Sequence, residues 1–154
     1  MIQMFVQNLW FVYALATAII WGLVYTLSEK ILGEQNVTPA ALIAVQGTIL
    51  FFFYWALFFV VESKPVQQIT NILSDTKQLA LIALIAILTG FAAFFIISSV
   101  SLKNATLANF VEISYPFFTM LFSWLLLRNF DLNIESIIGA CLIIAGITLI
   151  YFKG

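Results

Sequence analysis

The chain has 154 residues, of which 64% are hydrophobic and only 8% are charged, and its mean hydropathy is +1.12. In ordinary soluble domains about a quarter of the residues are charged, so this composition excludes such a domain. A formal net charge of −1 without a basic cluster argues against a nucleic-acid partner. Histidine is absent and Cys141 is the single cysteine, which excludes a disulfide framework, the zinc-ligand spacings and a Cys/His catalytic pair. We expect no metal and no cofactor.

Five long apolar stretches follow one another, each long enough for a membrane-spanning helix. The first has no basic region before it and is longer than the apolar part of a signal peptide, so we interpret it as a retained span. The longest connection, from Glu62 to Lys77, contains a segment at 67–73 that is able to lie flat on the membrane surface. The sequence thus predicts a single all-α transmembrane domain over residues 1–154, with helices at about 9–32, 38–61, 78–102, 105–127 and 134–152.

The six basic residues are distributed evenly between the two sides of the predicted membrane. If each stretch spans once, Lys64, Lys77 and Arg128 lie on one side, and Lys30, Lys103 and Lys153 lie on the other. Basic residues in short loops normally set the orientation of a membrane protein, so this chain carries a weak orientation signal. An odd number of spans without an orientation bias is expected of one half of an inverted-repeat transporter.

Glu112 is the one charged residue that lies deep within a predicted span. On a helix that advances about 100° per residue, it shares a narrow polar strip with Asn109, Pro116 and Thr119. Pro116 has no N–H to donate to the Glu112 carbonyl. An ionisable group inside a span costs about 2.5–3.5 kcal/mol, so it usually faces a cavity or a partner. We expect Glu112 to line a water-accessible pocket, where it can bind a cation or an amine or carry a proton. The alternative is a neutral carboxyl group hydrogen-bonded to Asn109 or to a neighbouring helix.

Further candidates for pocket walls lie in the other spans. Trp21 and Tyr25 lie at helical spacing on the first helix, where aromatic rings can bind a cation or anchor the helix at the interface. Gln46 interrupts the second span, either as a pocket wall or as a partner in a hydrogen bond between helices. The predicted substrate-binding residues are therefore Glu112, Asn109, Tyr115, Thr119, Trp21, Tyr25 and Gln46.

Glycines and prolines in the later spans are predicted to serve packing and bending. Gly90, Gly139 and Gly146 allow membrane helices to approach closely, and Pro116 allows a bend in the fourth helix. The other acidic residues lie at span ends or in connections, where solvation explains them. Paired carboxylates, a nucleophile constellation and a glycine-rich phosphate loop are not visible in the sequence, so we do not expect an enzyme.

Several short motifs, in order and over nearly the whole chain, resemble EamA-type proteins of the drug/metabolite transporter superfamily. They are Trp21-Gly22, 90–95 followed by 104–108, Tyr115-Pro116-Phe117-Phe118 with 125–127, and 138–147. The resemblance implies a five-helix repeat, which larger members carry twice in opposite orientations, and the export or exchange of small solutes. One departure stands out: the family often has a Gly-Glu pair after the fourth helix, where this chain has Asn129-Phe130-Asp131.

The prediction is thus a membrane transporter subunit for small metabolites or drug-like solutes, such as amino acids or amines. It would work by alternating access in a prokaryotic cytoplasmic (inner) membrane and couple to protons through Glu112. A single repeat requires a partner, either an antiparallel second copy or a paired five-helix chain. Two alternatives remain: an accessory or scaffold membrane protein that moves no solute, and a flippase of the same superfamily for a lipid or lipid-linked substrate.

Overall fold

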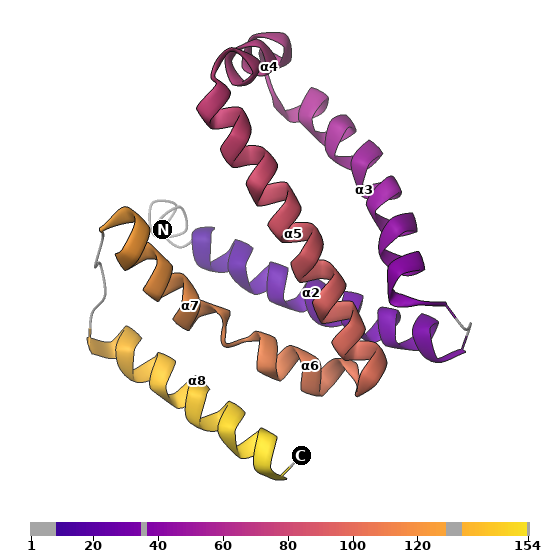
Figure 1. Cartoon of the computed structure of the whole chain (residues 1–154), viewed down its shortest axis with the longest axis vertical. Helices are drawn as coiled ribbons and strands as arrows, with labels where there is room; N and C mark the ends of the chain where they lie inside the picture. Colours follow the sequence, from indigo (N-terminus) through magenta and orange to yellow (C-terminus); the bar gives the residue numbers. More distant parts are fainter. Residues whose placement is uncertain (1–8, 35–36, 129–133, 154) are drawn as a thin grey trace. The chain divides into compact units, whose positions relative to one another are not determined.

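The computed structural model describes residues 9–34, 37–128 and 134–153, and these ranges contain helices and no strand (Figure 1). The all-α fold class is therefore confirmed for the described residues. In chain order, the elements are α2 (Leu9–Glu34), α3 (Pro39–Val61), α4 (Pro65–Ser74), α5 (Thr76–Leu102), α6 (Ala105–Glu112), α7 (Tyr115–Phe122), the π-helical turn η1 (Ser123–Leu127) and α8 (Ile134–Lys153).

Side-chain caps explain where three of these helices begin. The Thr38 hydroxyl accepts a hydrogen bond from the Ala41 N–H at 3.2 Å, with Pro39 in the first turn of α3. Asp75 Oδ1 accepts from the Lys77 N–H at 2.9 Å at the start of α5. Asn104 Oδ1 accepts from the Leu107 N–H at 2.8 Å at the start of α6. Each cap satisfies a backbone donor that has no partner inside its helix.

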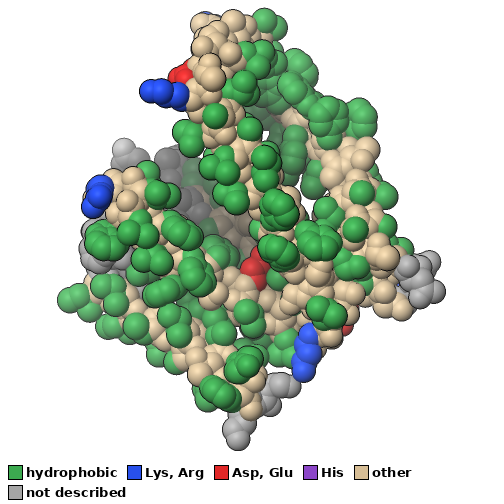
Figure 2. All heavy atoms as spheres, viewed as in Figure 1, with side chains coloured by type: hydrophobic (Ala, Val, Ile, Leu, Met, Phe, Trp, Pro, Cys, Tyr) green, Lys and Arg blue, Asp and Glu red, His purple; other side chains and the backbone are tan. Residues whose placement is uncertain are grey.

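Four helical segments in the described residues are long and apolar enough to cross a membrane: Phe11–Gly33, Pro39–Val61, Thr76–Leu102 and Ala105–Leu127. Hydrophobic side chains cover the outside of the helices on the face shown in Figure 2. Phe52, for example, is 67% exposed and Val60 83% exposed, which suits contact with lipid rather than with water. The apolar part of α8, Ile137–Phe152, is shorter than the other four, so the fifth predicted span is not confirmed by length and composition.

The chain divides into two compact units. One extends from Ile31 to Ser98 and contains α3, α4 and most of α5; within it α3 and α5 run in opposite directions and α4 joins them (Figure 1). The other contains α2 up to Lys30 together with the chain from Ser99 onward, and its helices α6 and α8 are in contact. Its buried residues are mostly small or lie at helix contacts: Tyr25, Ser28, Val100, Ala105, Ala108 and Ala140.

The segment 105–127, predicted as one helix, is divided into three elements. The Ile113 N–H donates to the Asn109 carbonyl at 3.0 Å and the Ser114 N–H to the Val111 carbonyl at 3.1 Å, which ends α6 in a turn. Pro116 lies in the first turn of α7, where a proline is tolerated because no helical donor is required of it. The predicted bounds agree with the candidate span Ala105–Leu127, but the helix within it is interrupted directly before Pro116.

Candidate functional site

Two side chains of α2 hold the two ends of α6. The Tyr25 hydroxyl donates a hydrogen bond to Glu112 Oε2 at 2.6 Å, at the last residue of α6. Glu29 Oε2 accepts a hydrogen bond from the Ala105 N–H at 2.7 Å, at the first residue of α6. Tyr25 and Glu29 are four residues apart and therefore lie on the same face of α2. Together they fasten α6 along α2 at both of its ends.

Burial supports this arrangement. Tyr25 is only 5% exposed, and Ala105 and Ala108 on α6 are 5% and 4% exposed. Small side chains at such a contact allow the backbones of two membrane helices to come close. Glu29 also places a negative charge at the N-terminal end of α6, where the helix dipole favours it. The contact between α2 and α6 is therefore held by packing, hydrogen bonds and charge together.

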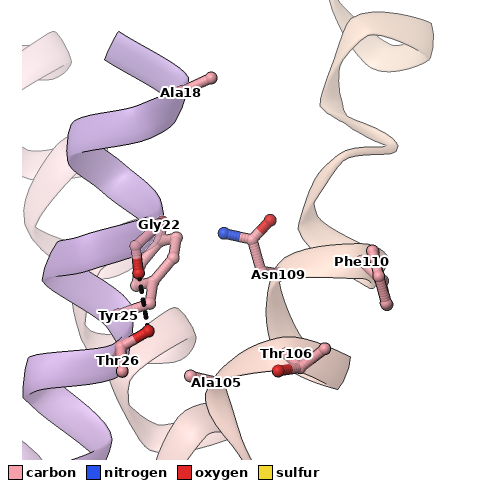
Figure 3. A pocket seen from close by; sticks show the side chains of 8 residues that line it. All are labelled: Ala18, Gly22, Tyr25, Thr26, Ala105, Thr106, Asn109 and Phe110. Carbon is pink, nitrogen blue, oxygen red and sulfur yellow. Dashed lines mark hydrogen bonds between the residues drawn. The ribbon is translucent and has the colours of Figure 1, made fainter. Parts of the chain in front are cut away.

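A pocket of about 240 Å³ opens beside this contact (Figure 3). This volume lies below the roughly 300–1,000 Å³ of pockets for drug-sized ligands, which suits a smaller solute. The half-buried Asn109 side chain extends across the pocket toward α2 in Figure 3, and the Thr26 hydroxyl donates to the Gly22 carbonyl at 3.0 Å. The lining residues carry no formal charge: Ala18, Gly22, Tyr25, Thr26, Ala105, Thr106, Asn109 and Phe110.

Four of the predicted site residues lie in one neighbourhood. Tyr25 and Asn109 line the pocket, and Glu112 accepts the hydrogen bond of Tyr25. The Trp21 ring stacks on that of Tyr25, with centroids 5.5 Å apart and an angle of 29° between the planes. The pocket therefore has a carboxylate, an amide and two aromatic rings at or next to its wall. Within the described ranges no group of three His, Cys, Asp or Glu residues is arranged to hold a metal ion.

Of the seven predicted residues, only Tyr25 and Asn109 are in the pocket lining. Glu112 and Trp21 contact Tyr25 but do not line the pocket, and the other three predicted residues are not part of the lining either. Tyr115 is 63% exposed on α7, and the Thr119 hydroxyl donates to the Tyr115 carbonyl of its own helix at 3.0 Å. Both residues follow the interruption after Glu112, so the polar strip that a continuous helix would have formed does not extend to them. Gln46 lies on α3 in the other unit. Roles of these three residues in substrate binding stay predictions.

The sequence analysis missed several residues of the site. Glu29 was interpreted as a solvated charge at a span end, yet it accepts the hydrogen bond of Ala105. Ala18, Gly22 and Thr26 recur every four residues along one face of α2, and all three line the pocket. That spacing of small side chains was a readable signal of a crevice along the helix.

The glycines that were predicted to serve packing make no close contact within the described chain. A Cβ atom built at Gly90, Gly139 or Gly146 would have no heavy atom within 4 Å, apart from those of its chain neighbours and of the backbone of its own helix. Gly139 is followed by the buried Ala140 on α8, so close packing of this helix uses the neighbouring position. Contacts of these glycines with a second chain, and a hinge at Pro116, stay predictions.

The chain is similar to a known protein family. No curated protein and no solved structure matches the chain significantly. The family model of the EamA-like transporter family matches residues 8–152, which includes all the elements described above except Lys153, the last residue of α8. This confirms the resemblance seen in the sequence motifs, and it agrees with the four apolar helices that are long enough to cross a membrane. The chain belongs to the EamA-like transporter family, within the drug/metabolite transporter superfamily of membrane proteins.

Proposed function

We propose that this chain is a transporter subunit that moves small solutes bearing an ammonium group, such as amino acids or amines, by alternating access. During the transport cycle, Glu112 would exchange its hydrogen bond with Tyr25 for a contact with the ammonium group of the solute. In the structure its carboxylate accepts a hydrogen bond from the Tyr25 hydroxyl, beside the pocket that Tyr25 and Asn109 line. This one contact supports the proposal, because it joins an acid of a predicted span to a residue that lines a pocket, in a chain of a transporter family.

The charges around the pocket favour a cationic solute or a proton. The described contacts give Glu112 a phenol as its partner, which is a neutral group, and no Lys or Arg lines the pocket. An ionised carboxylate within a span is costly unless a positive charge or a proton compensates it. A solute with an ammonium group would supply that charge, and the Trp21 and Tyr25 rings are placed to contribute cation–π attraction. A proton would compete for the same carboxylate, which is the basis for proton coupling.

The assembly that we propose is an antiparallel homodimer of five-span chains in a prokaryotic cytoplasmic membrane, with α8 as the fifth span. The even division of Lys and Arg between the predicted sides supports insertion in both orientations. A second, inverted copy would supply the other half of the transport path, as in transporters built from inverted repeats. Tags on both termini, tested for sidedness in the same cells, distinguish this assembly from a pair with a different chain. A single fixed orientation contradicts the homodimer.

The test of the function is counterflow in proteoliposomes that contain the purified chain, with labelled amino acids and amines as probes. We expect Glu112→Gln to reduce transport at least tenfold, because the amide has no charge to compensate and cannot carry a proton. Glu62→Gln is the matched control: Glu62 follows the last residue of α3, its carboxylate accepts the Lys64 N–H, and it is not among the residues that line the pocket. Undiminished transport by Glu112→Gln, with unchanged pH dependence, would contradict the proposal.

A further inference from the structure

We propose that α4 is an interfacial helix, which inserts Val66 and Leu73 among the lipid acyl chains and presents its amide side chains to water. The proposal concerns the contact of this chain with the bilayer and does not depend on transport.

The residues of α4 divide cleanly into two faces. With about 100° per residue, the apolar residues of this ten-residue helix fall within an arc of about 120°, and the polar residues occupy the opposite side. The apolar face contains Pro65, Val66, Ile69, Ile72 and Leu73, and the polar face contains Gln67, Gln68, Thr70, Asn71 and Ser74. A helix of strong amphipathic character with low overall hydrophobicity is the type that lies in a membrane interface.

The neighbouring elements place α4 at the depth of the membrane surface. It begins four residues after the candidate span that ends at Val61 and ends two residues before the candidate span that starts at Thr76. At no more than about 3.6 Å per residue, these links keep α4 close to the ends of both spans. Figure 1 shows α4 where α3 and α5 join, viewed nearly along its own axis while the two spans lie across the view. A helix turned in this way lies along the membrane surface rather than across it.

The apolar face of α4 is only partly covered by the chain itself. Ile69 and Ile72 are half-buried, whereas Val66 is 73% exposed and Leu73 is 62% exposed. The two open side chains are seven residues apart, so they project from the same side of the helix, two turns from each other. Water is an unfavourable environment for this side, and the acyl chains next to the ends of α3 and α5 are the apolar medium within reach.

Lysines flank α4 at both ends and suit anionic headgroups. The Glu62 carboxylate accepts the Lys64 N–H at 3.3 Å, and the Asp75 carboxylate accepts the N–H groups of Lys77 and Gln78 at 2.9 and 3.2 Å. Both acids therefore accept hydrogen bonds from backbone N–H groups. Within the described part of the chain, neither lysine side chain forms an ion pair. Exposed ammonium groups at the membrane surface attract the phosphates of anionic lipids. We therefore infer that α4 prefers a bilayer that contains such lipids.

Site-directed spin labelling tests the depth of α4 in the full chain. Cys141→Ser removes the single cysteine, and single cysteines are then introduced by Val66→Cys, Leu73→Cys, Gln67→Cys and Asn71→Cys. The labelled chains are placed in phosphatidylcholine vesicles, and the spectra are recorded with oxygen, which concentrates in the acyl region, and with a water-soluble nickel complex. Leu84→Cys, on the apolar span α5 where Leu84 is 51% exposed, gives the reference for a label deep in lipid.

We expect labels at Val66 and Leu73 to be relaxed by oxygen and protected from nickel, at about 5–10 Å below the headgroups. Labels at Gln67 and Asn71 should show the opposite. Equal access of nickel to all four labels would overturn the proposal by placing α4 in water. Protection of Val66 and Leu73 from both reagents would also overturn it, because protein would then cover this face.

The lipid preference is tested with the same Val66 label. Adding phosphatidylglycerol to the vesicles should deepen the label, and the double variant Lys64→Gln/Lys77→Gln should lose at least half of that change. Gln is a suitable replacement because it keeps a long polar side chain without the charge. A response to phosphatidylglycerol that is the same with and without the two lysines would overturn the assignment of the headgroup contact to them.

Discussion

Removal of the Tyr25 hydroxyl is the most direct perturbation of the site. Tyr25→Phe keeps the ring that stacks on Trp21 and deletes the donor that Glu112 accepts at 2.6 Å. Tyr13→Phe is the matched control on the same helix, because it makes the same chemical change in a side chain that is 67% exposed. The comparison isolates the hydrogen bond between α2 and α6 from the general effect of losing a phenolic oxygen.

The expected loss of stability follows from burial and charge. Hydrogen bonds to charged groups contribute about 1.5–3 kcal/mol in proteins, whereas hydrogen bonds between membrane helices average about 0.6 and reach about 1.7 kcal/mol. Tyr25 is 5% exposed but Glu112 is only half-buried, so water can replace part of the lost contact. We therefore expect Tyr25→Phe to lower the free energy of unfolding by about 1–2 kcal/mol, a factor of about 5–30 in the folding equilibrium. Tyr13→Phe should change it by less than about 0.5 kcal/mol.

Unfolding of the full chain by denaturing detergent in mixed micelles measures this difference. The double variant Tyr25→Phe/Glu112→Gln completes a mutant cycle. The change that it causes in the free energy of unfolding should differ from the sum of the changes caused by the two single variants by at least about 0.5 kcal/mol, since the two side chains are in contact. Equal unfolding midpoints for Tyr25→Phe and Tyr13→Phe, or strictly additive effects in the cycle, would refute the reasoning that this hydrogen bond holds α6 to α2.

Three further predictions concern neighbouring residues. Gly22→Ala should reduce transport of the larger probes more than that of the smallest, because Gly22 lines the pocket and a Cβ there meets open space. Gly33→Ala is the control, since a Cβ at Gly33 also meets open space on the same helix and Gly33 does not line the pocket. If both variants affect the transport of all probes equally, Gly22 has no role in selecting solutes by size. Glu29→Ala should destabilise the chain by about 1 kcal/mol in the detergent titration, as the loss of a capping acceptor does, because the Ala105 N–H loses its acceptor. Glu62→Ala should have a smaller effect. The reverse order would count against a role of Glu29 in holding α6 to α2. Lys64→Ala leaves two basic residues against three and should shift the ratio of the two orientations in terminal-tag assays; an unchanged ratio means that other features set the orientation.

The fold class and the identity of several site residues could be predicted from the sequence, because they depend on local patterns. Apolar runs of span length predict the helices, and Thr38-Pro39 marks the start of α3 by the local chemistry of a cap. Glu112 was identifiable because a charged residue deep in a span is unusual. These signals need no knowledge of how the chain folds back on itself.

The pairings within the site could not be predicted in this way, because they join residues far apart in the chain. Tyr25 and Glu112 are separated by 87 positions, and Glu29 and Ala105 by 76. No local pattern says which acid will meet which donor, so the sequence alone predicts only a solvated charge at Glu29. The interruption after Glu112 was missed for a related reason. Pro116 indicated a bend, but the residues at which α6 ends depend on the turn formed by Ile113 and Ser114.

The two carboxylates that contact α6 are placed at opposite ends of its dipole, and this separates their roles. Glu29 lies at the N-terminal end, where the partial positive charge of the helix stabilises a carboxylate, and it accepts a backbone N–H there. Glu112 lies at the C-terminal end, where the partial negative charge disfavours a carboxylate, and a neutral hydroxyl is its described partner. The first contact is satisfied as it stands. The second leaves the Glu112 carboxylate without a positive partner among the described contacts, next to Tyr25 of the pocket lining, where an ammonium group would find a negative charge. For this reason we propose a structural role for Glu29 and keep the proposed role in solute binding for Glu112.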